Sequence, residues 1–184
     1  MASEDRSPPR PLCRLYLVVP AGTTVAALNA ALDGGDVGCI RLQEPEEALR
    51  EVAQGRDVAC FLEDAHGAGR YDGIHLTDAA GFAEARASAG MVGVAADSRH
   101  DALEAAEAGA DYVALSGAEL VAWWAELMEV PCAAEGATTL DEAVELAKQG
   151  ADFVSLGSAI WNHPDGPKTA VEALNAAIAA TRPG

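Results

Sequence analysis

The stretch GADFVSLGSAIW, residues 150–161, decides the fold that we expect for this chain. Its apolar centre favours a buried strand over residues 152–156, and Gly157 gives the backbone freedom to turn into a short helix. Successive backbone N–H groups at such a turn, near Gly157 and Ser158, can bind an anion without a basic side chain. In a (β/α)8 barrel, the loops after strands seven and eight and a short extra helix commonly form a phosphate site. The alternative is an ordinary strand, turn and helix that binds nothing.

An internal repeat supports a barrel. The segment DALEAAEAGADYVALSGA begins at Asp101, and the similar segment EAVELAKQGADFVSLGSA begins at Glu142. Both read as helix, Gly-Ala-Asp turn and strand, and they are offset by two such units. Repetition by pairs fits a closed parallel barrel, although a flavodoxin-like open sheet remains possible.

Short apolar runs alternate with helical patterns along the rest of the chain. Strands are predicted at residues 14–20, 37–43, 57–62, 72–76, 91–96, 111–116 and 130–136. Helices are predicted at residues 24–32, 45–54, 79–88, 98–108, 118–128, 139–149 and 167–181. The segment EDAHGAGRY after the third strand is too short and glycine-rich for a full helix, so the third crossover is expected to be abbreviated. Eight units favour a compact α/β fold, the (β/α)8 TIM barrel.

The helix starts carry recognisable caps. Thr23 or Thr24 is expected to cap the helix at residues 24–32, and Thr138 or Thr139 the helix at residues 139–149. Glu142 is correctly spaced to form a capping box with Thr139.

Length and composition predict one domain. The 184 residues can bury a single core, which is expected to be aliphatic and alanine-rich because only 5% of residues are aromatic. Residues 1–12 read as a disordered leader and residues 13–184 as the barrel. The leader has no basic region followed by a hydrophobic run, so no signal peptide is expected.

Charge and cysteine content limit the partners and the compartment. A formal net charge of −17 argues against nucleic acid and anionic membrane surfaces. No apolar run reaches membrane-spanning length. The four cysteines, which lie in or beside apolar runs without CxxC spacing, are expected to be buried thiols in a reducing cytoplasm: Cys13, Cys39, Cys60 and Cys132. The pair Trp123-Trp124 is a candidate contact in a homo-oligomer, or one ring is buried against the barrel.

Chemistry in this fold occurs where the strands end. The candidate side chains and turns there are Gln43, Glu44, Glu63, Asp64, His75, Asp78, Asp97, Ser98, Ser116, Glu135, Gly136, Gly157 and Ser158. Glu63, Asp64 and Asp78 are candidates to converge on Mg²⁺ bound with substrate phosphates. The alternative for each is a solvated loop acid or helix cap. His75 is either a packed, hydrogen-bonded histidine or a catalytic one.

Three segments together resemble the thiamine-phosphate synthase family, which includes the thiazole tautomerases. They are DGIHL at residues 72–76, GVAADSRHDALEAAEAGADYVALS from Gly93, and PCAAEGATTLDEAVELAKQGADFVSLGSAIW from Pro131. The likeness extends from about residue 14 to residue 161. It implies a TIM barrel that binds Mg²⁺ and joins hydroxymethylpyrimidine diphosphate to a thiazole phosphate, with release of pyrophosphate. The family's closing motif is intact at residues 150–160.

The resemblance also exposes substitutions in the half of the site that would bind the diphosphate. The family's Gln-Leu-Arg after strand two appears here as Arg41-Leu42-Gln43. Arg41 is a candidate to reach inward from strand two, but alternation points it opposite to Leu42 and beside neither of the family's polar positions. The family's serine and histidine after strand five are missing, and Asp97 stands near the histidine's place.

The family's metal ligands are partly kept. Asp64 matches the first magnesium-binding aspartate. The second is absent at its usual place, where Asp78 could substitute if the loop shifts. A double glycine after strand seven has become Glu135-Gly136.

These substitutions affect the binding sites of the two substrates differently. The phosphate site of Gly136, Gly157 and Ser158 uses backbone donors and survives, whereas the cations that would face the leaving diphosphate are largely lost. The resemblance therefore implies a thiamine-phosphate synthase-like protein of thiamine biosynthesis with a degenerate active site. The alternatives are a non-catalytic or regulatory barrel that binds a phosphorylated ligand, and a tautomerase-like isomerase.

Overall fold

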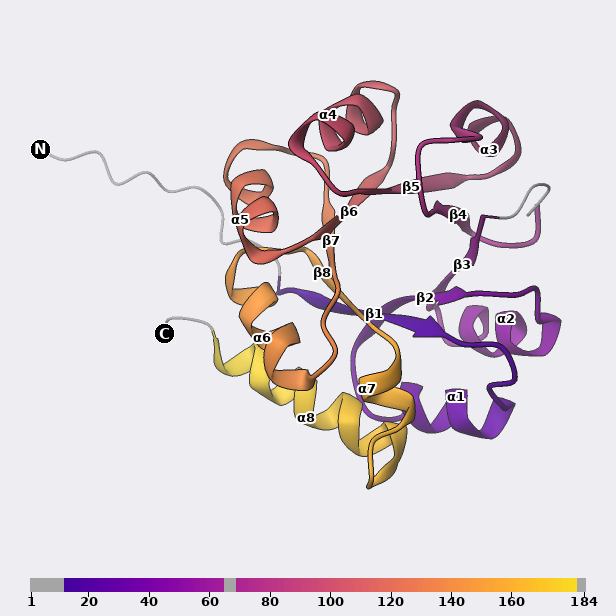
Figure 1. The fold of residues 1–184 in the computed structure, drawn as a ribbon. Helices are drawn as coiled ribbons and strands as arrows, with labels where there is room; N and C mark the ends of the chain where they lie inside the picture. The colour runs from indigo at the N-terminus through magenta and orange to yellow at the C-terminus, as the bar shows by residue number, and fades with distance from the viewer. Residues whose placement is uncertain (1–11, 65–68, 182–184) are drawn as a thin grey trace, which may run out of the picture.

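The computed structural model describes residues 12–64 and 69–181. Eight parallel strands close into a barrel in sequence order, and β8 pairs with β1 to complete it. The helices lie around the outside of the strands (Figure 1). The predicted TIM barrel is therefore confirmed, and the open-sheet alternative is wrong. The predicted leader falls outside these residues except for its last residue.

The elements follow the predicted order closely. The strands are β1 Arg14–Val19, β2 Val37–Leu42, β3 Ala59–Glu63, β4 Gly73–Leu76, β5 Met91–Ala96, β6 Tyr112–Ser116, β7 Cys132–Glu135 and β8 Phe153–Leu156. The helices are α1 Val25–Leu32, α2 Glu47–Gln54, α3 Phe82–Ser88, α4 Arg99–Glu107, α5 Ala118–Leu127, α6 Leu140–Lys148, α7 Ser158–Trp161 and α8 Gly166–Ala180.

Local chemistry sets several of these boundaries. Thr24 caps α1, and the predicted capping box of Thr139 and Glu142 opens α6. Strand β3 begins two residues later than predicted, because Asp57 has a φ of 57° and so belongs to the turn after α2. Between β3 and β4, the described residues contain no helix, as the abbreviated crossover requires.

The barrel has two cores because successive side chains point to opposite sides of each strand. Outward-facing aliphatic residues, such as Leu17, Ile40 and Val94, pack under the helices, as expected from composition. The lumen differs from that expectation, since three of its six core residues are aromatic. The lumen core is Tyr16, Cys39, Phe61, Tyr112, Ala114 and Ala133.

Glycines on neighbouring strands make room for these rings. A Cβ added to Gly93 would lie 1.9 Å from the ring of Tyr112, and one added to Gly73 would lie 2.5 Å from the ring of Phe61. Phe153 covers Gly38 in the same way. The rings therefore lie against the barrel wall, which only glycine permits at this distance.

Other expectations are also met. Trp124 is buried and its indole Nε1 donates to the carbonyl of Val130 at 2.7 Å, so one ring of the tryptophan pair packs against the barrel. Cys39, Cys60 and Cys132 are buried, as expected, and Cys13 is half-buried. No helix in the described ranges is long and apolar enough to cross a membrane.

Candidate active site at the carboxyl end of the barrel

The carboxyl ends of the eight strands meet at one end of the barrel, which we call the mouth. Five polar side chains face the lumen there, and strand pairing brings them together. Glu63 is in register with His75, and Ser116 with Glu135. Arg41, from β2, completes the set, because its position alternates with Leu42 as predicted.

Arg41 links three strands through two carboxylates. Its Nη1 donates to Oε1 of Glu135 at 2.8 Å, and its Nε lies 3.0 Å from Oε2 of Glu63 without hydrogen-bond alignment. Only 8% of Arg41 is exposed. Burial lowers the pKa of Arg41, but Glu135, Tyr16 and Glu63 outweigh burial and raise it. The guanidinium therefore stays charged and is already balanced by acids of the protein.

His75 belongs to a buried chain of hydrogen bonds. Its Nδ1 lies 2.8 Å from the hydroxyl of Tyr112, which is 2.8 Å from the hydroxyl of Tyr16. Its Nε2 has no hydrogen-bond partner among the described residues and lies 3.8 Å from Oε1 of Glu135. Burial lowers the pKa of His75 well below its usual value, and the charge of Arg41 lowers it further. The packed, hydrogen-bonded interpretation of this histidine agrees with the structure.

The two tyrosines were missed by the sequence analysis. Burial raises the pKa of both phenols well above the usual value, so both stay protonated. Alternation along β1 and β6 could have indicated that both side chains face the lumen. Their contact, however, joins residues 96 positions apart.

The three acids proposed to converge on a metal point to different partners. Glu63 turns inward to Arg41, while Asp64 accepts from the backbone N–H of Thr77 at 2.8 Å and from its hydroxyl at 2.5 Å. Asp78 accepts from the N–H of Ala80 at 2.6 Å. Among residues 12–64 and 69–181, no group of three or more His, Cys, Asp or Glu side chains is arranged to hold a metal. Asp64 therefore bonds to Thr77 in the loop after β4, and the three acids do not form a cluster in the described residues.

The candidate phosphate turns lie at the mouth but line different hollows. Ser158 borders a hollow of about 430 Å³ together with Thr138, Thr139 and His163. Gly136, whose φ is 91°, borders another hollow of about 420 Å³ with several acids of α6. Gly157 joins β8 to α7. The turn at Gly157 and Ser158 is therefore the better place for an anion.

The remaining candidates lie at the rim. Gln43 and Asp97 are exposed and lie directly after β2 and β5. Among the described residues, no hydrogen bond or ion pair joins either side chain to Arg41, Glu63 or Glu135. Ser98 caps α4 by accepting from the N–H of Asp101 at 3.2 Å.

The buried neutral His75 gives a prediction about acid stability. An unfolded histidine takes up a proton near pH 6.5. The buried ring does not, so acidification favours the unfolded chain. The folded pKa is the depressed one, so this contribution is complete above about pH 6.5 and is lost as pH falls, by up to about 1.4 kcal/mol per pH unit.

Denaturant unfolding of the parent and of His75→Gln between about pH 7.5 and pH 5.5 measures this contribution. We expect a shallower loss of unfolding free energy in His75→Gln. The exposed His100 provides the control, and His100→Gln should follow the parent. Equal pH slopes in the parent and His75→Gln would show that His75 is not held neutral.

The sequence was also compared with known proteins. No family model matches the chain. The thiamine-phosphate synthase of Rhodospirillum centenum (strain ATCC 51521 / SW) is 41% identical over 199 residues, covering 89% of this chain and 96% of the relative. The thiamine-phosphate synthase of Hyphomonas neptunium (strain ATCC 15444) is 36% identical over 94% of this chain and 96% of its own length.

Solved structures support the fold. A thiamine phosphate pyrophosphorylase from Pyrococcus furiosus superposes with a TM-score of 0.78 at 22% identity, covering 92% of this chain and 97% of that one. A tryptophan synthase from M. tuberculosis superposes with a TM-score of 0.72 at 16% identity, covering 94% of each chain. At these identities, the likeness concerns the barrel alone.

Proposed function

The chain belongs to the thiamine-phosphate synthase family, and we propose that it forms thiamine phosphate at the mouth of the barrel. In this reaction hydroxymethylpyrimidine diphosphate is joined to thiazole phosphate and pyrophosphate leaves. The observation that carries the proposal is the 41% identity over 96% of the Rhodospirillum centenum synthase. Both substrates are small phosphorylated molecules.

We place the thiazole phosphate at the turn of Gly157 and Ser158, with Gly136 on the neighbouring loop. Backbone N–H groups at such a turn can bind a phosphate despite the acidic surface, because they act over a short distance. A Cβ at Gly157 would meet only Val18, at 3.6 Å, so the protein leaves this approach open. The hydroxyl-lined hollow beside Ser158 supports the same position.

Asp64 is our candidate magnesium ligand. Mg²⁺ keeps several waters and borrows phosphate oxygens, so one aspartate with help from Glu63 or Asp78 can hold it. Both oxygens of Asp64 accept a hydrogen bond from Thr77, which orients the carboxylate and leaves lone pairs for a metal. Bound there, Mg²⁺ would supply positive charge to the leaving pyrophosphate.

The basic side chains of the protein contribute less positive charge to the leaving pyrophosphate than Mg²⁺ would. Arg41 is the only lysine or arginine in the carboxyl half of any described strand. Its charge is shared by Glu63 and Glu135, so the leaving pyrophosphate must compete with two carboxylates. The remaining pocket side chains, including neutral His75, can position the substrates but add no positive charge.

We therefore expect slow turnover. One stabilising group is worth about 3 kcal/mol, so the rate should fall about a hundredfold below a typical turnover of about 10 per second. The measurement is pyrophosphate release and thiamine phosphate formation by purified protein at saturating Mg²⁺ and both substrates, with thiazole phosphate omitted as control. Absence of any product would contradict the proposed function. Turnover near 10 per second would show that other groups bind the diphosphate.

Metal binding tests Asp64 separately. We expect Mn²⁺ to bind weakly alone and at least about tenfold more tightly with inorganic pyrophosphate, because phosphate oxygens complete the coordination. Asp64→Asn should lose most of this affinity. Asp101→Asn, on the exposed first turn of α4, should keep it. Equal Mn²⁺ affinity in the parent and Asp64→Asn would remove Asp64 from the metal site.

A further inference from the structure

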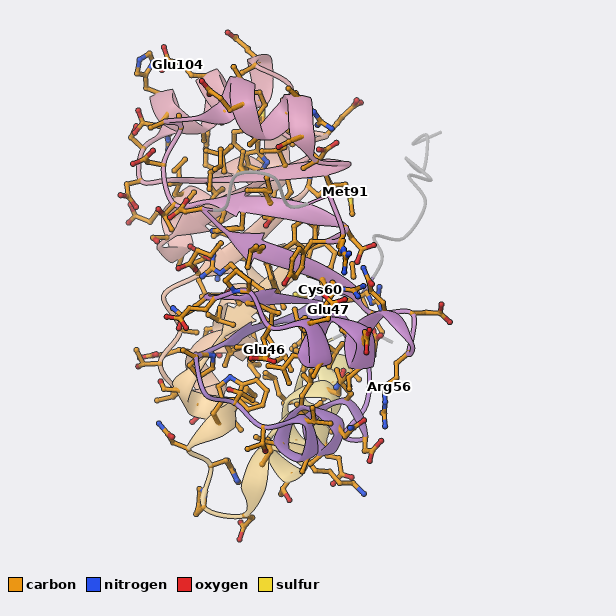
Figure 2. All side chains as sticks on the ribbon, turned by 90° about the vertical axis from the view of Figure 1, so that its right-hand side faces the viewer. Glu46, Glu47, Arg56, Cys60, Met91 and Glu104 are labelled. Atoms are coloured by element: carbon orange, nitrogen blue, oxygen red, sulfur yellow. The ribbon has the colours of Figure 1, made fainter. Side chains whose placement is uncertain are left out.

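A second cavity lies at the opposite end of the barrel from the mouth. It has a volume of about 210 Å³, and its lining includes Tyr16, Ala59, Phe61, Met91, Tyr112 and Phe153. Ala59, Met91, Tyr112 and Phe153 are the first residues of their strands. Met91 is 37% exposed at the rim, and Figure 2 shows it at the opposite end of the strands from Glu46.

Packing in the lumen explains why this space is open. Phe61 and Phe153 lie over Gly73 and Gly38 and therefore stay close to the barrel wall. The inward-facing side of β3 begins with the small Ala59. Because these residues are small or lie flat against the wall, the barrel axis is left unfilled at the amino-terminal end. In most such barrels, branched side chains fill the layers of the lumen.

A layer of rings separates this cavity from the mouth. The ring centroids of Tyr16 and Phe61 are 6.0 Å apart, and those of Phe61 and Tyr112 are 5.5 Å apart at nearly a right angle. His75 stacks on Tyr112 with centroids 5.9 Å apart. A molecule in the cavity therefore enters from the amino-terminal end and does not share the space of the mouth.

The lining is uncharged except for the carboxylate of Asp111 at the rim. The hydroxyls of Tyr16 and Tyr112 bond to each other, and that of Tyr112 also bonds to His75, so the cavity meets mainly their ring carbons. Burial raises the pKa of the Cys39 thiol, which stays neutral. The carboxylate of Asp111 at the rim is held by Arg86 and by the N–H of Val92, both through Oδ2.

We propose that this cavity binds one small neutral aromatic molecule of about the size of benzene. A water molecule fills a cavity favourably only where it finds several free polar partners. An engineered apolar protein cavity of about 150 Å³ stays dry and binds benzene. The aromatic walls add edge-to-face contacts with a bound ring. This site goes beyond the synthase reaction and does not depend on it.

Benzene titration of the full chain, observed through labelled methionine methyl groups, tests the proposal. The Met91 methyl should shift saturably with a Kd of about 1 mM, a reasonable affinity for so small a ligand. Met128, at the end of α5, should not shift and serves as internal control. Excess Mg²⁺ and pyrophosphate should leave binding unchanged. Absence of a saturable Met91 shift, or displacement by pyrophosphate, would overturn the proposal.

A filled cavity gives the matched variant. Ala59→Leu places three more carbons in the cavity and should weaken benzene binding at least about tenfold. Ala108→Leu adds the same atoms at an exposed site after α4 and should bind as the parent does. Unchanged affinity in folded Ala59→Leu would overturn the proposal, and if that variant does not fold, the Met91 titration of the parent decides.

Discussion

The ion pairs of Arg41 with Glu63 and Glu135 hold the mouth of this barrel together. The three residues come from β2, β3 and β7, and only 8% of Arg41 is exposed. Without the guanidinium, two carboxylates would face each other in a poorly solvated lumen, which is costly for like charges. Without either carboxylate, a buried cation would lose half of its compensation. The mouth therefore depends on all three residues.

The same interaction limits what the mouth can do. A synthase must stabilise a leaving pyrophosphate, and preorganised positive charge is the usual means. Here the strand-end guanidinium is preorganised toward carboxylates of its own chain. Neutral His75 and the phenols of Tyr16 and Tyr112 add hydrogen-bonding groups but no charge. Family membership and the surviving turn at Gly157 and Ser158 favour synthesis, while Arg41 explains why we expect that synthesis to be slow.

Local patterns were enough to predict the fold. Apolar runs indicated the strands, and the repeat of helix, Gly-Ala-Asp turn and strand indicated their parallel arrangement. The shifted start of β3 could not be read, because a positive φ at Asp57 leaves no composition signal. The lumen was predicted less well. Tyr16 meets Tyr112 across 96 residues, and such pairings depend on strand order and stagger that no single segment contains.

The sequence indicated where the site residues lie better than it indicated which residues they contact. Arg41, a candidate to reach inward from β2, does face the lumen, and Asp64 bonds to Thr77 in the loop after β4. Which carboxylate Arg41 would meet depended on closure of the barrel, since Glu135 lies 94 residues away. Asp64 follows the end of β3 with a φ of 44°, so its side chain does not continue the alternation of the strand and bonds to Thr77. This turn, which the sequence does not reveal, separates Asp64 from the inward-facing Glu63.

The most direct test of this account is the affinity for pyrophosphate with Mg²⁺ in the parent and in Glu135→Gln. Glutamine keeps the shape of the side chain and removes its charge, so Arg41 becomes available to the ligand. We predict about tenfold tighter binding in Glu135→Gln, because one freed charge-assisted contact is worth about 1.4 kcal/mol. Glu119→Gln, on the first turn of α5, should bind as the parent does. Equal affinity in the parent and Glu135→Gln would contradict the claim that Arg41 is withheld from the substrate by its own carboxylates.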